Sequence, residues 1–377
     1  MRERMSVVTP SSGEDRLESL LKPYRDRSNA QILAIWDEFA AEHPAGAFPS
    51  SRTMRLNSRL FTAGKRYRYA LALAGCQLLT GEQPSRGLER AATWVEWYHL
   101  YTLFLDDIMD EDVRRRTLAS AWATDAKLYR GPGADRPAVI FRTQRHRYGV
   151  SQAILDALRI RSLAERAIEG ATDLHPSIRL ELLSELTQVD LVLSDGQGLD
   201  IDFERANRIP EADYVRMSEA KTARLYLGAA ASAAVAARAS SEDRAALEAF
   251  ARSFAIAFQD RDDLLGSGVV ESKIGGSAEG DIRQGKRTRL FVLAMQRLAR
   301  KDRAAFLRAY GRGPRTTKAD IRSVRNLLRE NVVATMESRI ADHLVAAQGA
   351  LDRLPRKSVD ARALLEVLLE AQRSRVR

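Results

Sequence analysis

Apolar residues recur at intervals of three and four along most of this 377-residue chain, which is the spacing of one buried face of an α-helix. No convincing run of strict apolar–polar alternation occurs, so the pattern predicts no β-sheet. Helices are expected over residues 16–27, 28–42, 53–79, 86–113, 151–170, 176–194, 211–238, 241–265, 288–299, 302–310, 318–347 and 359–372. The pattern therefore predicts an all-α fold.

Proline and glycine mark the breaks between these helices. Loops are expected around Pro44 and Pro49, at the 81–84 turn and over 131–137. The chain is long for one domain, but a single large helical bundle is compatible with its length. We expect residues 16–377 to form one all-α domain after a loosely ordered, polar segment 1–15.

Composition narrows the setting of the protein. Cys76 is the single cysteine, so no intrachain disulfide can form and a reducing compartment is favoured. The first residues lack the apolar core of a signal peptide, and no apolar run reaches the length of a membrane span. These features predict a cytoplasmic protein without stable membrane insertion.

The formal net charge of +10 raises the question of a polyanionic partner. Most basic residues are scattered over Arg-rich helix faces rather than gathered in one run with aromatics between them, although residues 142–147 are unusually basic. No nucleic-acid partner is therefore expected. A basic protein would also attract diphosphates.

The first candidate site lies where the expected helix 86–113 ends. At helical spacing Asp106 and Asp110 stand one above the other on one face, and Asp107 lies about 100° round the helix. Three carboxylates at the end of a buried helix repel one another unless cations lie between them, and Mg²⁺ prefers oxygen ligands. Taken alone, this cluster could equally be an acidic helix end on the surface.

A second apolar helix, 241–265, ends in the same way. It carries Asp262 and Asp263, and basic residues follow at Lys273 and Lys286. Two helices that end in paired aspartates, each followed by cations, suggest one cavity in which metal ions and cations hold a polyphosphate. The stretch 280–286 reads GxxxxGK, but Arg287 stands where a P-loop needs Ser or Thr, and no strand precedes it. A nucleotide-binding site is therefore rejected.

With these residues in view, the sequence resembles the trans-isoprenyl diphosphate synthases, the polyprenyl synthetase family. The resemblance covers roughly residues 55–295 and recurs in order. The matching motifs are Gly64-Lys65-Arg66-Tyr67-Arg68 (GKRxR), Asp106 to Asp110 with Arg115-Arg116 (DDxxD-x4-RR), Gly196-Gln197 with Asp200 (GQxxD), Lys221-Thr222 (KT) and Phe258 to Asp263 (FQxxDDxxD). The family implies a bundle of roughly 10–14 helices around a central apolar cavity.

The resemblance also implies roles for individual residues. Ligands of three Mg²⁺ ions would be Asp106, Asp107, Asp110, Asp262 and Asp263. Isopentenyl diphosphate would be held by Lys65, Arg68, His99 and Arg116. The allylic diphosphate would be contacted by Arg115 and Lys221, and the departing diphosphate by Lys273 and Lys286. Oxygens facing the allylic carbocation would come from Thr222 and Gln259.

By the same resemblance, the reaction joins isopentenyl diphosphate to an allylic diphosphate in a homodimer packed through the 86–113 region. The floor of the tail cavity would be formed by Tyr98, Tyr101 and Thr102. A lone aromatic five positions before Asp106 is similar to C20 (geranylgeranyl) producers, with C15 (farnesyl) the nearest alternative.

Several positions depart from the family pattern. Gly266 stands where a third aspartate is often found, Tyr69 replaces a proline and Thr117 a glycine. The loops 129–148 and 273–281 look extended. Two other functions stay open: a terpene synthase or atypical prenyltransferase, and a non-catalytic modulating subunit. The intact isopentenyl diphosphate set argues against the former, and the intact first aspartate motif against the latter.

Overall fold

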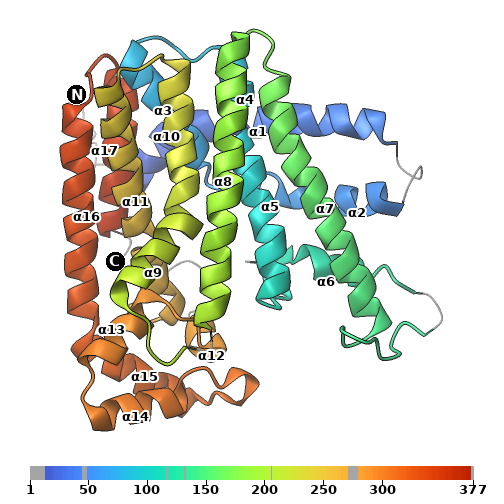
Figure 1. Cartoon of the computed structure of the whole chain (residues 1–377), viewed down its shortest axis with the longest axis vertical. Helices are drawn as coiled ribbons and strands as arrows, with labels where there is room; N and C mark the ends of the chain where they lie inside the picture. Colours follow the sequence, from blue (N-terminus) through green and yellow to red (C-terminus); the bar gives the residue numbers. More distant parts are fainter. Residues whose placement is uncertain are drawn as a thin grey trace, which may run out of the picture.

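The computed structural model describes residues 13–44, 49–115, 118–130, 133–204, 206–270 and 279–374. Its α-helices are α1 (Gly13–Glu42), α2 (Pro49–Asn57), α3 (Tyr67–Thr80), α4 (Arg86–Ala91), α5 (Trp94–Met109), α6 (Ala121–Ala126), α7 (Gln144–Glu169), α8 (Pro176–Phe203), α9 (Glu211–Ser218), α10 (Arg224–Ala236), α11 (Ser241–Ser267), α12 (Gly280–Gln284), α13 (Arg289–Arg297), α14 (Arg300–Ala309), α15 (Lys318–Asn331), α16 (Val333–Arg353) and α17 (Val359–Ser374). Several long helices run along one axis, and α12 to α15 gather at one end of it (Figure 1). The all-α fold is confirmed.

One part of the secondary-structure prediction is wrong. Strand β1 (Arg114–Arg115) pairs antiparallel with β2 (Leu118–Ala119), so the described residues do contain a two-stranded sheet. Each strand has two residues, which is too short to show the apolar–polar alternation by which a strand is recognised in a sequence.

The described residues form seventeen α-helices, more than the roughly ten to fourteen expected, because several expected helices are broken and because α6 and α12 form where no helix was expected. The expected helix 86–113 is divided into α4 and α5 at Ala92 and Thr93, and the expected helix 318–347 into α15 and α16 at Val332. The two helices expected over 16–42 are instead the single helix α1, despite Pro23 within it. Its buried residues keep helical spacing across the supposed break, so one packing face continues; they are Leu21, Tyr24, Ser28, Ile32 and Ile35. Residues 13–15 begin this helix, while residues 1–12 lie outside the described part.

Helix α5 lies deep in the bundle because it is apolar nearly all round. Trp94, Trp97 and Tyr98 are at most 1% exposed. The indole Nε1 of Trp94 donates to Ser232 on α10 at 2.9 Å. The small residues of α10 allow this close approach: a Cβ on Gly228 would lie 2.8 Å from the Trp94 ring. The helix that ends in the first aspartate cluster is therefore firmly held.

A buried ion pair fixes the chain just before α3. Arg66, in the left-handed region at φ 65°, contacts Glu96 of α5 at 3.1 Å, and its guanidinium also donates to the carbonyl of Phe61. The other oxygen of Glu96 accepts from the backbone N–H of Tyr69. Breaking such a pair leaves a buried charge without its partner, which costs several kcal/mol. The middle arginine of the GKRxR motif is therefore structural, and it sets the positions of its neighbours Lys65 and Arg68. Separately, none of the described helices is both long and apolar enough to cross a membrane.

Candidate active site

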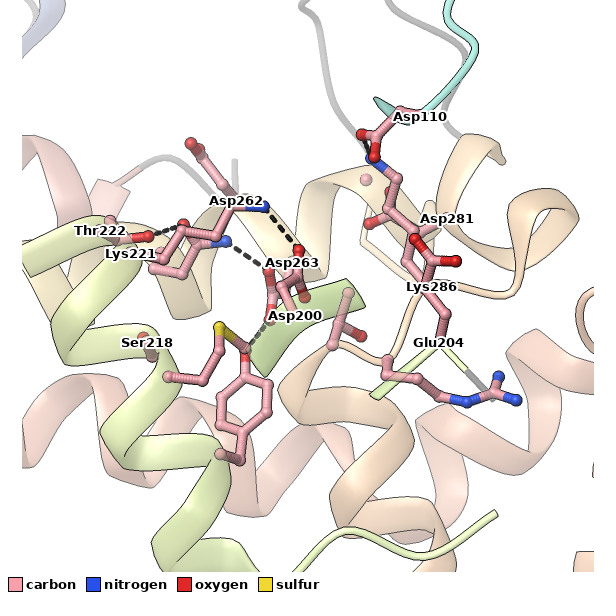
Figure 2. Close-up of a pocket in the computed structure, with 16 residues that line it drawn as sticks. Asp110, Asp200, Glu204, Ser218, Lys221, Thr222, Asp262, Asp263, Asp281 and Lys286 are labelled. Atoms are coloured by element: carbon pink, nitrogen blue, oxygen red, sulfur yellow. Dashed lines mark hydrogen bonds and ion pairs between the residues drawn. The ribbon is translucent and has the colours of Figure 1, made fainter. Parts of the chain in front are cut away.

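The two aspartate-rich helix ends meet at one polar cavity of about 280 Å³. Figure 2 shows Lys221 and Thr222 on one side of it and Lys286 with Asp110 on the other. The lining residues are Asp110, Asp200, Glu204, Tyr214, Met217, Ser218, Lys221, Thr222, Gln259, Asp262, Asp263, Gly266, Asp281, Lys286, Arg287 and Thr288. This described cavity is lined mainly by polar residues, so it corresponds to the diphosphate end of the expected site rather than to an apolar tail cavity.

Lys221 reaches the cavity from an irregular helical turn. Residues Glu219–Ala223 form a π-helix, labelled η2, between α9 and α10, where the sequence pattern predicts an unbroken helix. Single π turns often occur at functional sites because they redirect side chains. Gly196 of α8 packs against this turn: a Cβ there would lie 2.5 Å from the backbone nitrogen of Lys221. The glycine of the GQxxD motif therefore lets α8 approach the turn closely.

The ammonium group of Lys221 links two of the motifs. It lies 2.5 Å from Asp200 Oδ2 and 3.9 Å from Asp106 Oδ1. Burial alone lowers the pKa of Lys221, but Asp106 and Asp200 outweigh this effect, so its pKa is raised. The lysine therefore stays charged within the cavity wall.

Lys286 occupies the corresponding position on the opposite side. It follows α12 and contacts Asp110 Oδ2 at 2.8 Å, so the first aspartate motif is paired with a cation at each end. Asp281, the second residue of α12, lies in the same wall, and its carboxylate packs against Gly266 of α11. A Cβ on Gly266 would overlap Asp281 Oδ2 and lie 3.0 Å from its Cγ. The space beside Gly266 is therefore filled by a carboxylate from another helix.

Burial raises the affinity for protons of carboxyl groups in and beside the cavity, and the neighbouring lysines oppose this effect. Burial raises the pKa of Asp106; Lys221 opposes the shift and Asp110 adds to it. Burial likewise raises the pKa of Asp281 to about 6, with Lys286 lowering it and Asp110 raising it. Such carboxylates gain stability from any further cation placed among them.

Three side chains that line the cavity, those of Thr222, Gln259 and Asp263, form a hydrogen-bonded chain. Thr222 Oγ1 donates to Gln259 Oε1 at 3.0 Å, and Gln259 Nε2 donates to Asp263 Oδ1 at 2.8 Å. The other oxygen of Asp263 accepts from the hydroxyl of Tyr214 and from the backbone N–H of Arg289. Burial raises the pKa of Asp263 to about 8, with Asp260 adding to the shift. Asp262, one residue earlier, lines the same cavity.

Two residues that the sequence assigns to ligand contacts are bound to each other. Arg115 contacts Asp107 at 2.7 Å, and the side chain of Asp107 is 2% exposed. Neither lines the described cavity. Arg116 and Lys273 lie outside the described residues, so their predicted contacts with diphosphate stay predictions.

The remaining candidates for isopentenyl diphosphate lie around a set of aromatic rings. Lys65 Nζ lies 5.6 Å from the ring of Tyr67, and the guanidinium of Arg68 lies 4.4 Å from the ring of Tyr226. Both rings contact Phe258, the residue before Gln259. The GKRxR cations are thus brought next to the second aspartate motif. His99 lies on α5, half-buried, and does not line the described cavity.

The predicted chain-length residues lie nearer the N-terminal end of α5 than Asp106 does. The rings of Tyr98 and Tyr101 meet edge to face with centroids 5.2 Å apart. The hydroxyl of Tyr98 donates to Asp190 of α8 at 2.6 Å, and Thr102 Oγ1 donates to the carbonyl of His99. These three residues do not line the described cavity.

Sequence reasoning gave no role to Asp200 or Asp281, although both stand inside recognised stretches. Asp200 is the last residue of GQxxD, and Asp281 follows Gly280 in the stretch rejected as a P-loop. The available signal for Asp281 was Gly266 itself, because a missing carboxylate in a cation site invites a search for a substitute.

Comparison with known proteins agrees with this geometry. Residues 52–328 match the family model described as Polyprenyl synthetase. The chain is 28% identical over 312 residues to the geranylfarnesyl diphosphate synthase of Aeropyrum pernix, covering 81% of this chain and 89% of that protein. It is 28% identical over 311 residues to the geranylgeranyl diphosphate synthase of Methanosarcina mazei, covering 82% and 85%.

Solved structures share the fold. A geranylgeranyl pyrophosphate synthetase from Pyrococcus horikoshii superimposes with a TM-score of 0.79 at 23% identity, covering 97% of this chain and all 100% of that one. A geranylgeranyl pyrophosphate synthase from Corynebacterium glutamicum, complexed with isoprenyl diphosphate and magnesium, gives a TM-score of 0.78 at 25% identity, covering 95% and 99%. The resemblance inferred from the motifs is confirmed: this chain belongs to the polyprenyl synthetase family and is a prenyltransferase of the isoprenyl diphosphate synthase class.

Proposed function

We propose that this enzyme condenses isopentenyl diphosphate with allylic diphosphates and releases a C20, geranylgeranyl, product. The observation that carries the proposal is the polar cavity at which both aspartate-rich helix ends meet two half-buried lysines, Lys221 and Lys286. Carboxylates and lysines in one cavity suit a diphosphate that binds with its metal ions.

The donor set fits Mg²⁺. Within the described residues, no group of three or more acidic, histidine or cysteine side chains is close enough together to hold one ion. Mg²⁺ is commonly held by one or two carboxylates and completed by substrate phosphates and water. We propose that three ions are shared in this way by Asp106, Asp110 and Asp262. When bound, they would neutralise the diphosphate and assist its departure as Lewis acids.

The protein side chains would divide the remaining tasks. Lys221 would bind the allylic diphosphate and Lys286 the departing one, because each ammonium group already lies in the cavity wall. The hydrogen bond from Gln259 to Asp263 orients the Gln259 amide so that its oxygen, together with Thr222 Oγ1, can face a developing allylic cation. Lys65 and Arg68 would hold isopentenyl diphosphate beside Phe258.

The sequence also favours Asp107 and Asp263 as metal ligands. The oxygens of Asp107 accept from Arg115, and those of Asp263 accept from Gln259, Tyr214 and the backbone of Arg289. We therefore propose that these two carboxylates act first by orienting their neighbours, and that Arg115 reaches a diphosphate only if it leaves Asp107.

The C20 product is proposed from the residues below Asp106. Tyr101 stands five positions before Asp106, with the smaller Thr102 at four, and its ring packs against that of Tyr98, which Asp190 fixes. The Methanosarcina mazei relative is a geranylgeranyl diphosphate synthase, in line with this length. A C15 product is the nearest alternative.

We also propose a homodimer. The resemblance places the contact in the region 86–113, but Trp94, Trp97 and Tyr98 of α5 are buried inside this chain. We therefore assign the contact to exposed leucines of α7 and α8, which provide apolar area for a second copy; they are Leu155, Leu158, Leu180 and Leu191. Sedimentation at micromolar concentration tests this, and a monomer there would count against it.

One assay tests the function. The purified protein is incubated with Mg²⁺, isopentenyl diphosphate and dimethylallyl, geranyl or farnesyl diphosphate in turn, and the products are sized by chromatography. Linear C20 products that disappear with EDTA support the proposal. Products that contain no isopentenyl unit indicate a terpene synthase or atypical prenyltransferase, and the absence of any product indicates a modulating subunit.

A further inference from the structure

The segment between α6 and α7 carries two adjacent apolar side chains in full contact with solvent. Val139 is 103% exposed and Ile140 is 83% exposed. In Figure 1 this segment leaves the bundle beyond the start of α7 and lies toward the same end of the long axis as α12. Single exposed apolar residues are common on protein surfaces, but a fully exposed adjacent pair on a projecting loop is a candidate contact site.

The base of this loop is tied by its own backbone. Gln144 N–H donates to the carbonyl of Arg136 at 3.0 Å, and Arg145 N–H donates to the carbonyl of Ala134 at 2.9 Å. At the start of the segment, the ring of Tyr129 stacks on that of Tyr148 with centroids 5.3 Å apart. The tip that carries Val139 and Ile140 is therefore presented on a closed base.

The charge around the tip has one dominant sign. Residues 127–147 contain six basic residues and one acidic residue on the surface, Asp135, which pairs with Arg145 at 3.3 Å; Asp125, just before this segment, is buried. Arg136 and Arg142 stand three residues before Val139 and two after Ile140, and both are exposed. The segment therefore carries half of the formal net charge of the whole chain, which is +10.

We propose that this basic–apolar surface, formed by loop residues 133–143 and the first turn of α7 up to Arg147, docks the enzyme on the surface of a membrane rich in anionic lipids. A bilayer offers phosphate charge directly above an apolar layer, which matches arginines flanking a valine–isoleucine tip. The phosphates of a nucleic acid could bind the arginines, but a nucleic acid has no apolar layer into which Val139 and Ile140 could insert. The loop binds the surface and does not span it, and the proposal does not depend on the length of the prenyl product.

The test is flotation of the full-length enzyme with vesicles. Vesicles of phosphatidylcholine are compared with vesicles that also contain about 30 mol% phosphatidylserine, at low and at physiological salt. The protein is expected to float with the anionic vesicles only, and less so as salt rises. Each basic residue near such a surface contributes about fivefold in partitioning, so R136A/R142A/R147A should reduce binding on the order of 100-fold.

Matched variants distinguish binding through the loop from binding through net charge or through other exposed apolar residues. V139S/I140S should lose most vesicle binding, whereas V345S/V359S removes two other exposed valines, which are 66% and 82% exposed, and should bind as the parent does. R300A/K301A/R308A removes three exposed charges elsewhere and should cause a smaller loss than the loop triple variant. All these positions lie on the surface, so the fold, followed by circular dichroism, should be unchanged.

The outcomes decide the proposal. Loss of flotation in both loop variants, with no loss in V345S/V359S and a smaller loss in R300A/K301A/R308A, supports it. Absence of flotation by the parent protein at low salt overturns it, as does equal loss in loop and control variants. Binding of a DNA oligonucleotide that depends on the three arginines and not on Val139 and Ile140, without vesicle binding, would replace it with a polyanion site.

Discussion

The carboxylate of Asp281 lies against the α-carbon of Gly266, in the space that a side chain at position 266 would need. Gly266 is the position at which the second aspartate motif of the family often has its third carboxylate. Asp281 comes from α12 and reaches the same wall of the cavity. We infer that the missing acidic group of α11 is supplied by α12.

Moving the carboxylate from position 281 to position 266 tests this relationship. Gly266→Asp should lower kcat/KM at least about tenfold, because overpacking and like-charge repulsion would displace α12. Combining it with Asp281→Gly should restore part of the activity, since one carboxylate again fills the space. A double variant no better than Gly266→Asp alone would show that the two positions are not interchangeable.

Gly196 should be equally intolerant of a methyl group. Gly196→Ala would bring a Cβ within 2.5 Å of the backbone nitrogen of Lys221, so the π turn must shift and kcat/KM should fall. Gly198→Ala, two residues along the same helix, meets nothing within 4 Å and is the matched control. That variant should keep full activity and gain up to about 1 kcal/mol in the free energy of unfolding. Equal kinetics for the two variants would contradict the role given to Gly196.

The metal ligands should be dispensable for folding but not for turnover. Asp106→Ala or Asp262→Ala should lower kcat by at least about 100-fold while leaving the helical circular dichroism spectrum intact, because each change removes a charge at or beside the cavity rather than core packing. Asp342→Ala, an exposed carboxylate of α16, serves as the control. Near-normal turnover in either site variant, or in EDTA, would exclude the proposed metal site.

The product length should respond to Tyr101. One turn of helix rises about 5 Å, roughly the length of one isoprene unit, so Tyr101→Ala should lengthen the product by one or more units. Tyr101→Phe keeps the ring and should leave the length unchanged. A Tyr101→Ala product distribution identical to that of the parent would move the floor elsewhere, for which Tyr98 is the next candidate.

A buried carboxyl pair outside the active site should make stability depend on pH. Burial, with Asp156 adding to it, raises the pKa of Asp125 to about 7, and the two carboxylates share the amide of Asn57. Between about pH 4 and pH 7 the folded state holds a proton that the unfolded state has released, so the free energy of unfolding falls as pH rises through this window. Above about pH 7, Asp125 is ionised in both states, and the full cost of burying its charge lowers the free energy of unfolding.

Asp125→Asn removes that penalty and keeps an acceptor for Asn57. Its free energy of unfolding at pH 8 should exceed that of the parent by on the order of 2 kcal/mol, and its pH dependence should be weaker. Denaturant titrations at pH 5 and pH 8 measure both effects. Asp135→Asn, with a side chain 83% exposed, should change neither. A variant equally destabilised at both pH values would refute the assignment.

The sequence predicts the helices and the aspartate clusters because periodicity and charge are local properties. Its motifs also select Lys221 and Lys286, which both line the described cavity, and their roles toward diphosphate stay predictions. The π turn at Lys221 could not be foreseen, because the stretch around it is helix-forming throughout and the irregularity accompanies a contact with Gly196 of another helix.

The same limit applies to the substitution at Gly266. That Asp281 fills the gap depends on how the chain returns between α11 and α12, which no local pattern specifies. Similarly, only the fold shows that Arg66 is bound inside the protein by Glu96, while Lys65 and Arg68 on either side face the aromatic rings. Neighbouring cations in one motif thus have different tasks.

Lys221 and Lys286, which are each paired with aspartate, would exchange these partners when a diphosphate binds. Lys221 lies between Asp200 and Asp106, and Lys286 pairs with Asp110, so two ammonium groups face three carboxylates. The cavity also contains Asp262, Asp263 and Asp281, so its carboxyl groups outnumber its lysines. When a diphosphate arrives with its cations, each lysine would exchange a carboxylate for a phosphate oxygen, and each carboxylate would exchange a lysine for a metal ion. Departure of the diphosphate would reverse this exchange, and each lysine would again pair with a carboxylate.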